Sequence, residues 1–176
     1  ALFSALRELG YRLDSPNGRL PVVVHGQGPR PGRCRVSIQD SSQFASALML
    51  TASRGGWDVT VEGENPDESP YIRMTAEMTR AFPTHGGRFE IEPDASSCSY
   101  LWAANWLLET AREGGARGPW VTVDPAPVSD WQIDTAFPRF VPPLPTVSRR
   151  SDLGDSIMTL IALAPLFPRE TRFTDL

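Results

Sequence analysis

The sequence contains no lysine, and this absence removes several kinds of chemistry. All 17 basic residues in the chain of 176 are arginine. Schiff-base catalysis needs a lysine amine, so it is excluded, as is any mechanism that needs an ammonium group from a lysine of this chain. The formal net charge is −4, and we therefore expect no general role in nucleic-acid binding.

Cysteine and histidine are also scarce. Cys34 and Cys98 are too few for a disulfide framework and lack the paired spacing of a zinc site, so we expect buried, reduced thiols. His25 and His85 have no second histidine within a few residues, so neither a metal site nor a cofactor is expected. No run of 18 apolar residues and no signal peptide occur, which predicts a soluble, cytoplasmic protein without a membrane partner.

Hydrophobic periodicity predicts a mixed α/β chain, with helices that alternate with short strands. Helices are expected at residues 1–10, 41–53, 69–82, 94–115 and 154–167, and strands at 20–26, 34–39, 57–63, 88–93, 119–125 and 171–176. Gly114 and Gly115 are expected to end the fourth helix. Residues 136–152 contain four prolines and are expected to form a loop or an extended connection, because proline disrupts helices and central strands.

A pattern of an aspartate, a serine and an apolar helix occurs three times. Asp40, Asp94 and Asp155 are about 55 to 60 residues apart, and each precedes an apolar helix that leads to a β-type run. This spacing predicts an internal repeat of a β-α-β-α unit, with parallel strands joined by crossover helices. The three helices are apolar enough to be buried together.

The small polar groups at these helix starts allow two interpretations. Serine and aspartate are favoured N-cap residues, and capping alone accounts for each of them taken singly. The start of a helix also presents free N–H groups and the positive end of the helix dipole, so adjacent serines there can bind a phosphate. Ser41 and Ser42, between a strand and a helix, are the strongest candidates for such a site.

Four segments resemble the 5-enolpyruvylshikimate-3-phosphate (EPSP) synthase family, in that family's order. They are "DSSQFASALMLTA" at 40–52, "SPYIRMT" at 69–75, "DASSCSYLWAA" at 94–104 and "GDSIMTLIALAPLF" at 154–167. "WQID" at 131–134 is a weaker echo of the family's Q-G-D segment. The resemblance implies two domains of repeated βαβαββ units in an inside-out α/β barrel arrangement, here incomplete. It assigns residues 1–93 to part of the first domain and 94–176 to part of the second.

The resemblance also implies an activity and the residues that serve it. The family transfers the enolpyruvyl group of phosphoenolpyruvate to the 5-hydroxyl of shikimate 3-phosphate. Ser41 and Ser42 match the serines that hold the 3-phosphate group, and Gln43 matches a glutamine that contacts both substrates. Tyr71 matches a tyrosine that lines the shikimate pocket. Asp155 matches the carboxylate that accepts the proton of the 5-hydroxyl, although an ordinary N-cap is an equal alternative.

The chain departs from the family pattern in ways that bear on activity. Glu68 replaces the family's serine three residues before the tyrosine, and a carboxylate beside a bound phosphate would repel it unless it turned away. In the family, the lysine and arginines that bind phosphoenolpyruvate lie in the N-terminal and C-terminal parts of the enzyme, and this chain resembles neither part. The hairpins near residues 84–92 and 138–152 look short. We therefore expect negligible catalysis by this chain alone.

Three functions remain open on this evidence. The first is a fragment or divergent member of the synthase family, active only together with its missing segments. The second is a non-catalytic module that keeps the fold and binds an anion or a partner. The third, with less support, is an enolpyruvyl transferase that acts on a sugar nucleotide. The first helical pattern is already under way at residue 1, which favours a piece of a longer protein.

Overall fold

The computed structural model describes residues 1–65, 68–111 and 119–176, and its elements fall into two units. Unit 1 comprises Ala1–Thr84 and unit 2 comprises His85–Leu176. Each unit has its own apolar core. Over the described ranges, no helix is both long and apolar enough to cross a membrane.

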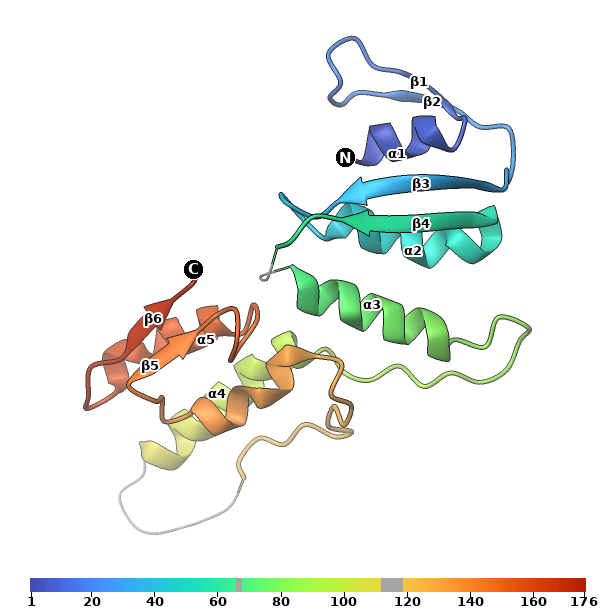
Figure 1. The fold of residues 1–176 in the computed structure, drawn as a ribbon. Coiled ribbons are helices and arrows are strands. Elements are labelled where there is room, and N and C mark those ends of the chain that lie inside the picture. Colours follow the sequence, from blue (N-terminus) through green and yellow to red (C-terminus); the bar gives the residue numbers. More distant parts are fainter. Residues whose placement is uncertain (66–67, 112–118) are drawn as a thin grey trace. The chain divides into compact units, whose positions relative to one another are not determined.

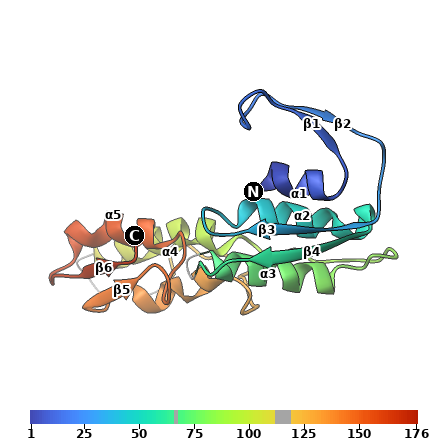
Figure 2. The ribbon, with the colours of Figure 1, turned by 45° about the horizontal axis from the view of Figure 1, so that its top comes forward.

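Unit 1 is built on a strand–helix–strand crossover. Its elements are α1 (Leu2–Glu8), β1 (Arg12–Asp14), β2 (Val23–His25), β3 (Gly32–Ser37), α2 (Gln43–Gly55), β4 (Trp57–Glu62) and α3 (Ser69–Ala81). β3 and β4 pair in parallel and α2 joins them, as the sequence predicted, whereas β1 and β2 form a separate antiparallel pair. Figures 1 and 2 show α1 beside β3, α2 along the strand pair and α3 beside α2.

Alternation along the strands and periodicity along the helices create the core of unit 1. In β4, Trp57, Val59 and Val61 are half-buried, and the residues between them are exposed. They pack against a buried cluster drawn from α1, β3 and α2 and the turns next to them: Ala5, Leu9, Cys34, Val36, Ile38, Ala45 and Leu48. A two-stranded parallel sheet is stable only when helices cover it, and α1 and α2 provide that cover.

Unit 2 repeats the parallel crossover with shorter elements. It contains α4 (Ala95–Thr110), the 3₁₀ helix η1 (Ile133–Phe140), β5 (Thr146–Ser148), α5 (Ile157–Leu163), the 3₁₀ turn η2 (Ala164–Leu166) and β6 (Arg172–Thr174). β5 and β6 pair in parallel, with α5 between them in the chain. The predicted helix at 94–115 ends at Thr110, and Gly114 and Gly115 lie outside the described residues.

The proline-containing segment contributes to the core of unit 2, which corrects the prediction for residues 136–152. That stretch includes most of η1 and all of β5. Pro138 fits η1 because its fixed φ suits a 3₁₀ turn, while its missing N–H limits the helix to a short length. η1 buries Phe137 completely, and the ring of Phe137 stacks on Trp102 of α4 with the ring centroids 6.2 Å apart.

The predictions of two strands are wrong. Residues 88–93 and 119–125 form no strand, although both have apolar residues with strand-like alternation. In the second segment, the N–H groups of Trp120 and Val121 donate to Oδ1 of Asn105 on α4, at 2.7 and 3.2 Å. In the first, the carboxylate of Glu92 binds the loop at 128–132. Side chains, rather than a neighbouring strand, therefore hold both segments.

The mixed α/β class is confirmed, but the larger repeat is not. Each unit contains one β-α-β crossover with parallel strands. Every sheet among the described residues has two strands, so neither a complete βαβαββ unit nor a closed barrel is present in that part of the chain. The thiols of Cys34 and Cys98 are buried and free, as expected, and burial raises the pKa of each.

Replacing Leu160 with alanine should destabilise the protein by about 2–5 kcal/mol, because Leu160 is fully buried in the core of unit 2. Met158 lies on the same helix and is 65% exposed, so Met158→Ala should change the free energy of unfolding by less than about 0.5 kcal/mol. Urea denaturation of both variants measures the difference. Equal effects of the two substitutions would contradict this orientation of α5.

Candidate functional site

The starts of two helices meet at one end of the parallel strand pair in unit 1. β3 and β4 both end there, α2 begins after β3, and α3 begins at the same end (Figure 1). Asn65 reinforces this arrangement, since its Nδ2 donates to the carbonyl oxygens of Ile38 and Gln39 at 3.2 and 2.9 Å. In open α/β folds, ligands bind at the carboxyl ends of parallel strands, so this end is the candidate site.

The predicted phosphate-binding residues lie at this end. Ser42 is the N-cap residue of α2 and is only 4% exposed, whereas Ser41 is half-buried and Gln43 is exposed. The N–H of Gln43 donates to Oγ of Ser41 at 3.2 Å. The side chain of Ser42 makes no capping hydrogen bond. Capping by a serine therefore accounts for Ser41, but the hydroxyl of Ser42 has no such role.

A carboxylate already occupies the start of α2. Oε2 of Glu68 accepts a hydrogen bond from the backbone N–H of Ser42 at 2.7 Å. Glu68 is itself the N-cap residue of α3, so this bond joins the starts of the two helices. The sequence placed Glu68 next to the expected phosphate, where it would repel the ligand unless it turned away. In the structure the Glu68 side chain does not turn away, because its carboxylate accepts from the Ser42 N–H.

Tyr71 lies in the first turn of α3, close in sequence to Glu68, and its side chain is half-buried. Its carbonyl oxygen accepts from the hydroxyl of Thr75 at 2.9 Å. That hydroxyl also lies 2.9 Å from Oγ of Ser46 on α2, which fixes α3 against α2. Through Glu68 and this hydroxyl pair, the structure brings the Ser41–Gln43 segment and the first turn of α3 together.

Asp155 lies in unit 2, and its surroundings are different. It directly precedes Ser156, the N-cap residue of α5, and its side chain is 60% exposed. Nη2 of Arg149 lies 3.0 Å from Oδ1 of Asp155, so a guanidinium group pairs with the predicted proton acceptor. Of the three repeated aspartates, only Asp94 caps its helix, by accepting from the N–H groups of Ser96 and Ser97.

Sequence reasoning missed Asp134, which lies beside Asp155. Asp134 is 5% exposed, and its Oδ1 accepts from the backbone N–H of Ser156 at 2.8 Å. Oγ of Ser156 is itself buried and has no hydrogen-bond partner among the described residues. The start of α5 thus receives a carboxylate from a distant segment, as the start of α2 does from Glu68. The acidic position in "WQID" was the only available signal for this role.

Gln132, two residues before Asp134, serves the start of α4. Its Oε1 accepts from the N–H of Ala95 at 2.7 Å, and its Nε2 donates to the carbonyl oxygen of Pro93 at 3.0 Å. Next to it, the carboxylate of Glu92 accepts from the N–H groups of Val128 and Ser129 and from Oγ of Ser129. This network supports the loop before η1, and it explains "WQID" as a structural segment.

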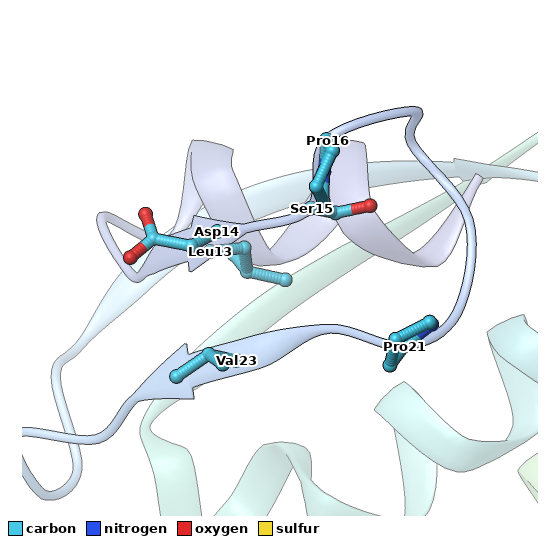
Figure 3. A pocket seen from close by; sticks show the side chains of 6 residues that line it. All are labelled: Leu13, Asp14, Ser15, Pro16, Pro21 and Val23. Carbon is cyan, nitrogen blue, oxygen red and sulfur yellow. The ribbon is translucent and has the colours of Figure 1, made fainter.

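An open pocket lies elsewhere in unit 1, at the β1–β2 hairpin (Figure 3). It has a volume of about 580 Å³ and is lined by Leu13, Asp14, Ser15, Pro16, Pro21 and Val23. Hydrogen bonds from Arg12 and then His25 lower the pKa of Asp14, and Oδ2 of Asp14 lies 2.6 Å from Nε2 of His25. The lining is mostly apolar and carries a carboxylate, so it does not suit a phosphate ligand. None of the predicted site residues lines it.

Comparison with known proteins gives one consistent family. A model of the family described as EPSP synthase (3-phosphoshikimate 1-carboxyvinyltransferase) matches residues 1–85, nearly the same range as unit 1. Relatives named 3-phosphoshikimate 1-carboxyvinyltransferase match most of the chain. That of Pseudomonas syringae pv. tomato is 31% identical in an alignment that covers 98% of this chain and 44% of the relative.

Two further relatives carry the same name. The protein of Rhizobium leguminosarum bv. trifolii is 32% identical over 98% of this chain and 44% of its own length. The protein of Syntrophobacter fumaroxidans is 40% identical over 58% of this chain and 29% of its own length. The chain thus spans less than half the length of the curated relatives it matches.

Glu92→Gln should make the stability of the protein less dependent on pH. Burial opposes ionisation of this carboxyl, but the hydrogen bonds from Ser129, Val128 and Gln132 outweigh it and lower its pKa below the ordinary 4.5. The stabilisation by ionised Glu92 is therefore present above about pH 4.5 and lost as the pH falls through the lowered pKa.

Thermal melts between about pH 2 and 7 test this expectation. Glu92→Gln should melt below the wild type at neutral pH, and the two curves should converge in acid. Glu90→Gln is the matched control, because Glu90 is exposed on the same segment. A constant gap between wild type and Glu92→Gln at every pH would contradict the role of the charge.

Proposed function

We propose, since the chain belongs to the EPSP synthase family, that it is part of an enzyme that transfers the enolpyruvyl group of phosphoenolpyruvate to the 5-hydroxyl of shikimate 3-phosphate. The observation that carries the proposal is the position of the Ser41–Gln43 segment. It lies at the carboxyl end of β3 and at the start of α2, beside the first turn of α3. Relatives of the protein that match 98% of the chain are named for this reaction.

In this proposal, unit 1 supplies the binding site for the phosphate of shikimate 3-phosphate. Ser41 and Ser42 offer hydroxyl and backbone N–H donors, which suit phosphate oxygens at the positive end of a helix dipole. Exposed Gln43 is free to contact substrate, and half-buried Tyr71 lines the ring pocket. Residues 1–93 and 94–176 then form parts of the first and second transferase domains.

Asp155 in unit 2 is the proposed proton acceptor. A carboxylate can take the proton of the 5-hydroxyl as that oxygen adds to carbon 2 of phosphoenolpyruvate, whose double bond opens while carbon 3 gains a proton. Departure of inorganic phosphate from carbon 2, with loss of a proton from carbon 3, then restores the double bond. Arg149, whose Nη2 lies 3.0 Å from Oδ1 of Asp155, holds the carboxylate in place. Cations that stabilise the phosphate and carboxylate of phosphoenolpyruvate are also required. We expect these from other parts of the enzyme, so that this chain binds one substrate without catalysing the reaction.

The second candidate is a non-catalytic module of the same fold that binds an anion or a partner. The contact between Glu68 and Ser42 favours it, because a carboxylate occupies the N–H donor that the phosphate would use. The two candidates differ in selectivity. A working half of the synthase site prefers shikimate 3-phosphate to inorganic phosphate, whereas an anion-binding module does not distinguish the ring.

Calorimetric titration of the purified chain with shikimate 3-phosphate tests the first candidate, with inorganic phosphate as the competing ligand. We expect selective binding of shikimate 3-phosphate, and we expect Ser41→Ala combined with Ser42→Ala to abolish it. The double substitution should cost only about 1 kcal/mol of stability, through the lost hydrogen bond at Ser41.

Thr51→Ala is the matched control for this titration. Thr51 is an exposed hydroxyl residue on the same helix, and its hydroxyl donates within the helix to the carbonyl oxygen of Ala47. It should leave binding unchanged. Unchanged affinity in the double serine variant would show that these hydroxyls do not hold the phosphate. Equal affinity for the two ligands would favour the non-catalytic module.

A further inference from the structure

The bond between Glu68 and Ser42 places an anion from the chain itself at the start of α2. The carboxylate oxygen lies 2.7 Å from the amide nitrogen, a typical length for a charge-assisted hydrogen bond. Ser42 is 4% exposed, so the bond is shielded from solvent on the side of Ser42. The amide at this turn thus already has a carboxylate oxygen as its acceptor.

A phosphate at the same turn would compete with Glu68 on two grounds. The Ser42 N–H has one hydrogen to donate, so strong bonds to both acceptors are incompatible. A phosphate dianion and a carboxylate within hydrogen-bonding distance of one amide also repel each other, and this repulsion is strong where solvent is excluded. Binding of a phosphate therefore requires the Glu68 side chain to leave the Ser42 N–H.

The backbone around Glu68 confines that movement to the side chain. The N–H of Glu68 donates to the carbonyl oxygen of Asn65 at 3.1 Å, and the side chain of Asn65 is held by the carbonyl oxygen of Gln39 at 2.9 Å. The carbonyl oxygen of Glu68 accepts from the N–H groups of Tyr71 and Ile72 in the first turn of α3. A rotation of the carboxylate away from Ser42 breaks none of these bonds.

We propose that Glu68 is an internal competitor for the phosphate of the ligand and sets the affinity and selectivity of the site. The inference rests on the proposed function of the Ser41–Gln43 segment. When no ligand is bound, the carboxylate satisfies the Ser42 N–H. A phosphorylated ligand must displace it, so weakly bound free phosphate is rejected, whereas a ligand that also gains contacts with its ring can bind.

The test compares Glu68→Gln and Glu68→Ser with the wild type in calorimetric titrations. Glutamine keeps the size of the side chain and an acceptor oxygen but removes the charge, and serine removes both. We expect each variant to bind shikimate 3-phosphate at least tenfold more tightly than the wild type. Affinity for shikimate, which lacks the phosphate, should change less than twofold.

Glu64→Gln is the matched control, because Glu64 is an exposed carboxylate in the same loop. It removes the same charge, and its effect on affinity should stay within twofold. The backbone amide resonance of Ser42, followed by NMR during titration with inorganic phosphate, gives a second readout that does not depend on the sugar ring. It should shift in Glu68→Gln at phosphate concentrations that leave the wild type unchanged.

The outcomes separate this inference from the proposed function. If the wild type and Glu68→Gln bind shikimate 3-phosphate with equal affinity, the inference is overturned and the proposed function stands. A Ser42 amide that responds to inorganic phosphate only in Glu68→Gln, with no binding of shikimate 3-phosphate by either protein, would uphold the competition between Glu68 and phosphate and overturn the function. A Ser42 amide that responds to phosphate in neither protein would overturn the inference.

Discussion

Hydrogen bonds from backbone amides to carboxylates of distant segments are the interaction on which both units depend. Glu68 binds the start of α2, Asp134 binds the start of α5, and Glu92 binds the loop before η1. The first N–H groups of a helix have no partner within it, and an ionised acceptor both satisfies them and interacts favourably with the helix dipole. With two-stranded sheets throughout the described residues, backbone pairing between strands alone holds few segments together.

The use of distant carboxylates as acceptors for helix N–H groups directly affects the candidate site. The helix start proposed to bind the phosphate is also used for internal support. The same bond, from Glu68 to Ser42, stabilises the join between α2 and α3 and lowers the availability of the N–H donor to a ligand. If the proposed site binds the phosphate, support of the fold and recognition of the ligand depend on the same donor, and a change that improves one weakens the other.

The sequence predicted elements with a strong local pattern better than contacts between segments far apart in the chain. Periodicity located α1, α2, α3 and the parallel strands β3 and β4, because each depends on neighbours in sequence. Residues 119–125 alternate like a strand, but Asn105 takes their first N–H groups, and no pattern reveals a partner so far away. The roles of Ser41, Ser42, Gln43, Tyr71 and Asp155 come from the resemblance and stay predictions. The geometry of Glu68 and the role of Asp134 depend on contacts across 26 and 22 residues, which only the structure provides.

The Gln132–Asp134 segment has a consequence for how the chain can vary in length. Its two polar side chains, separated by Ile133, reach the first N–H of α4 and the N-cap residue of α5. One residue added between them would rotate one side chain away from its helix, and both contacts could not be kept together. Insertions and deletions should therefore be rare at this point, even where the identity of the middle residue drifts. The spacing of these two residues therefore constrains the segment in addition to their hydrogen-bonding groups.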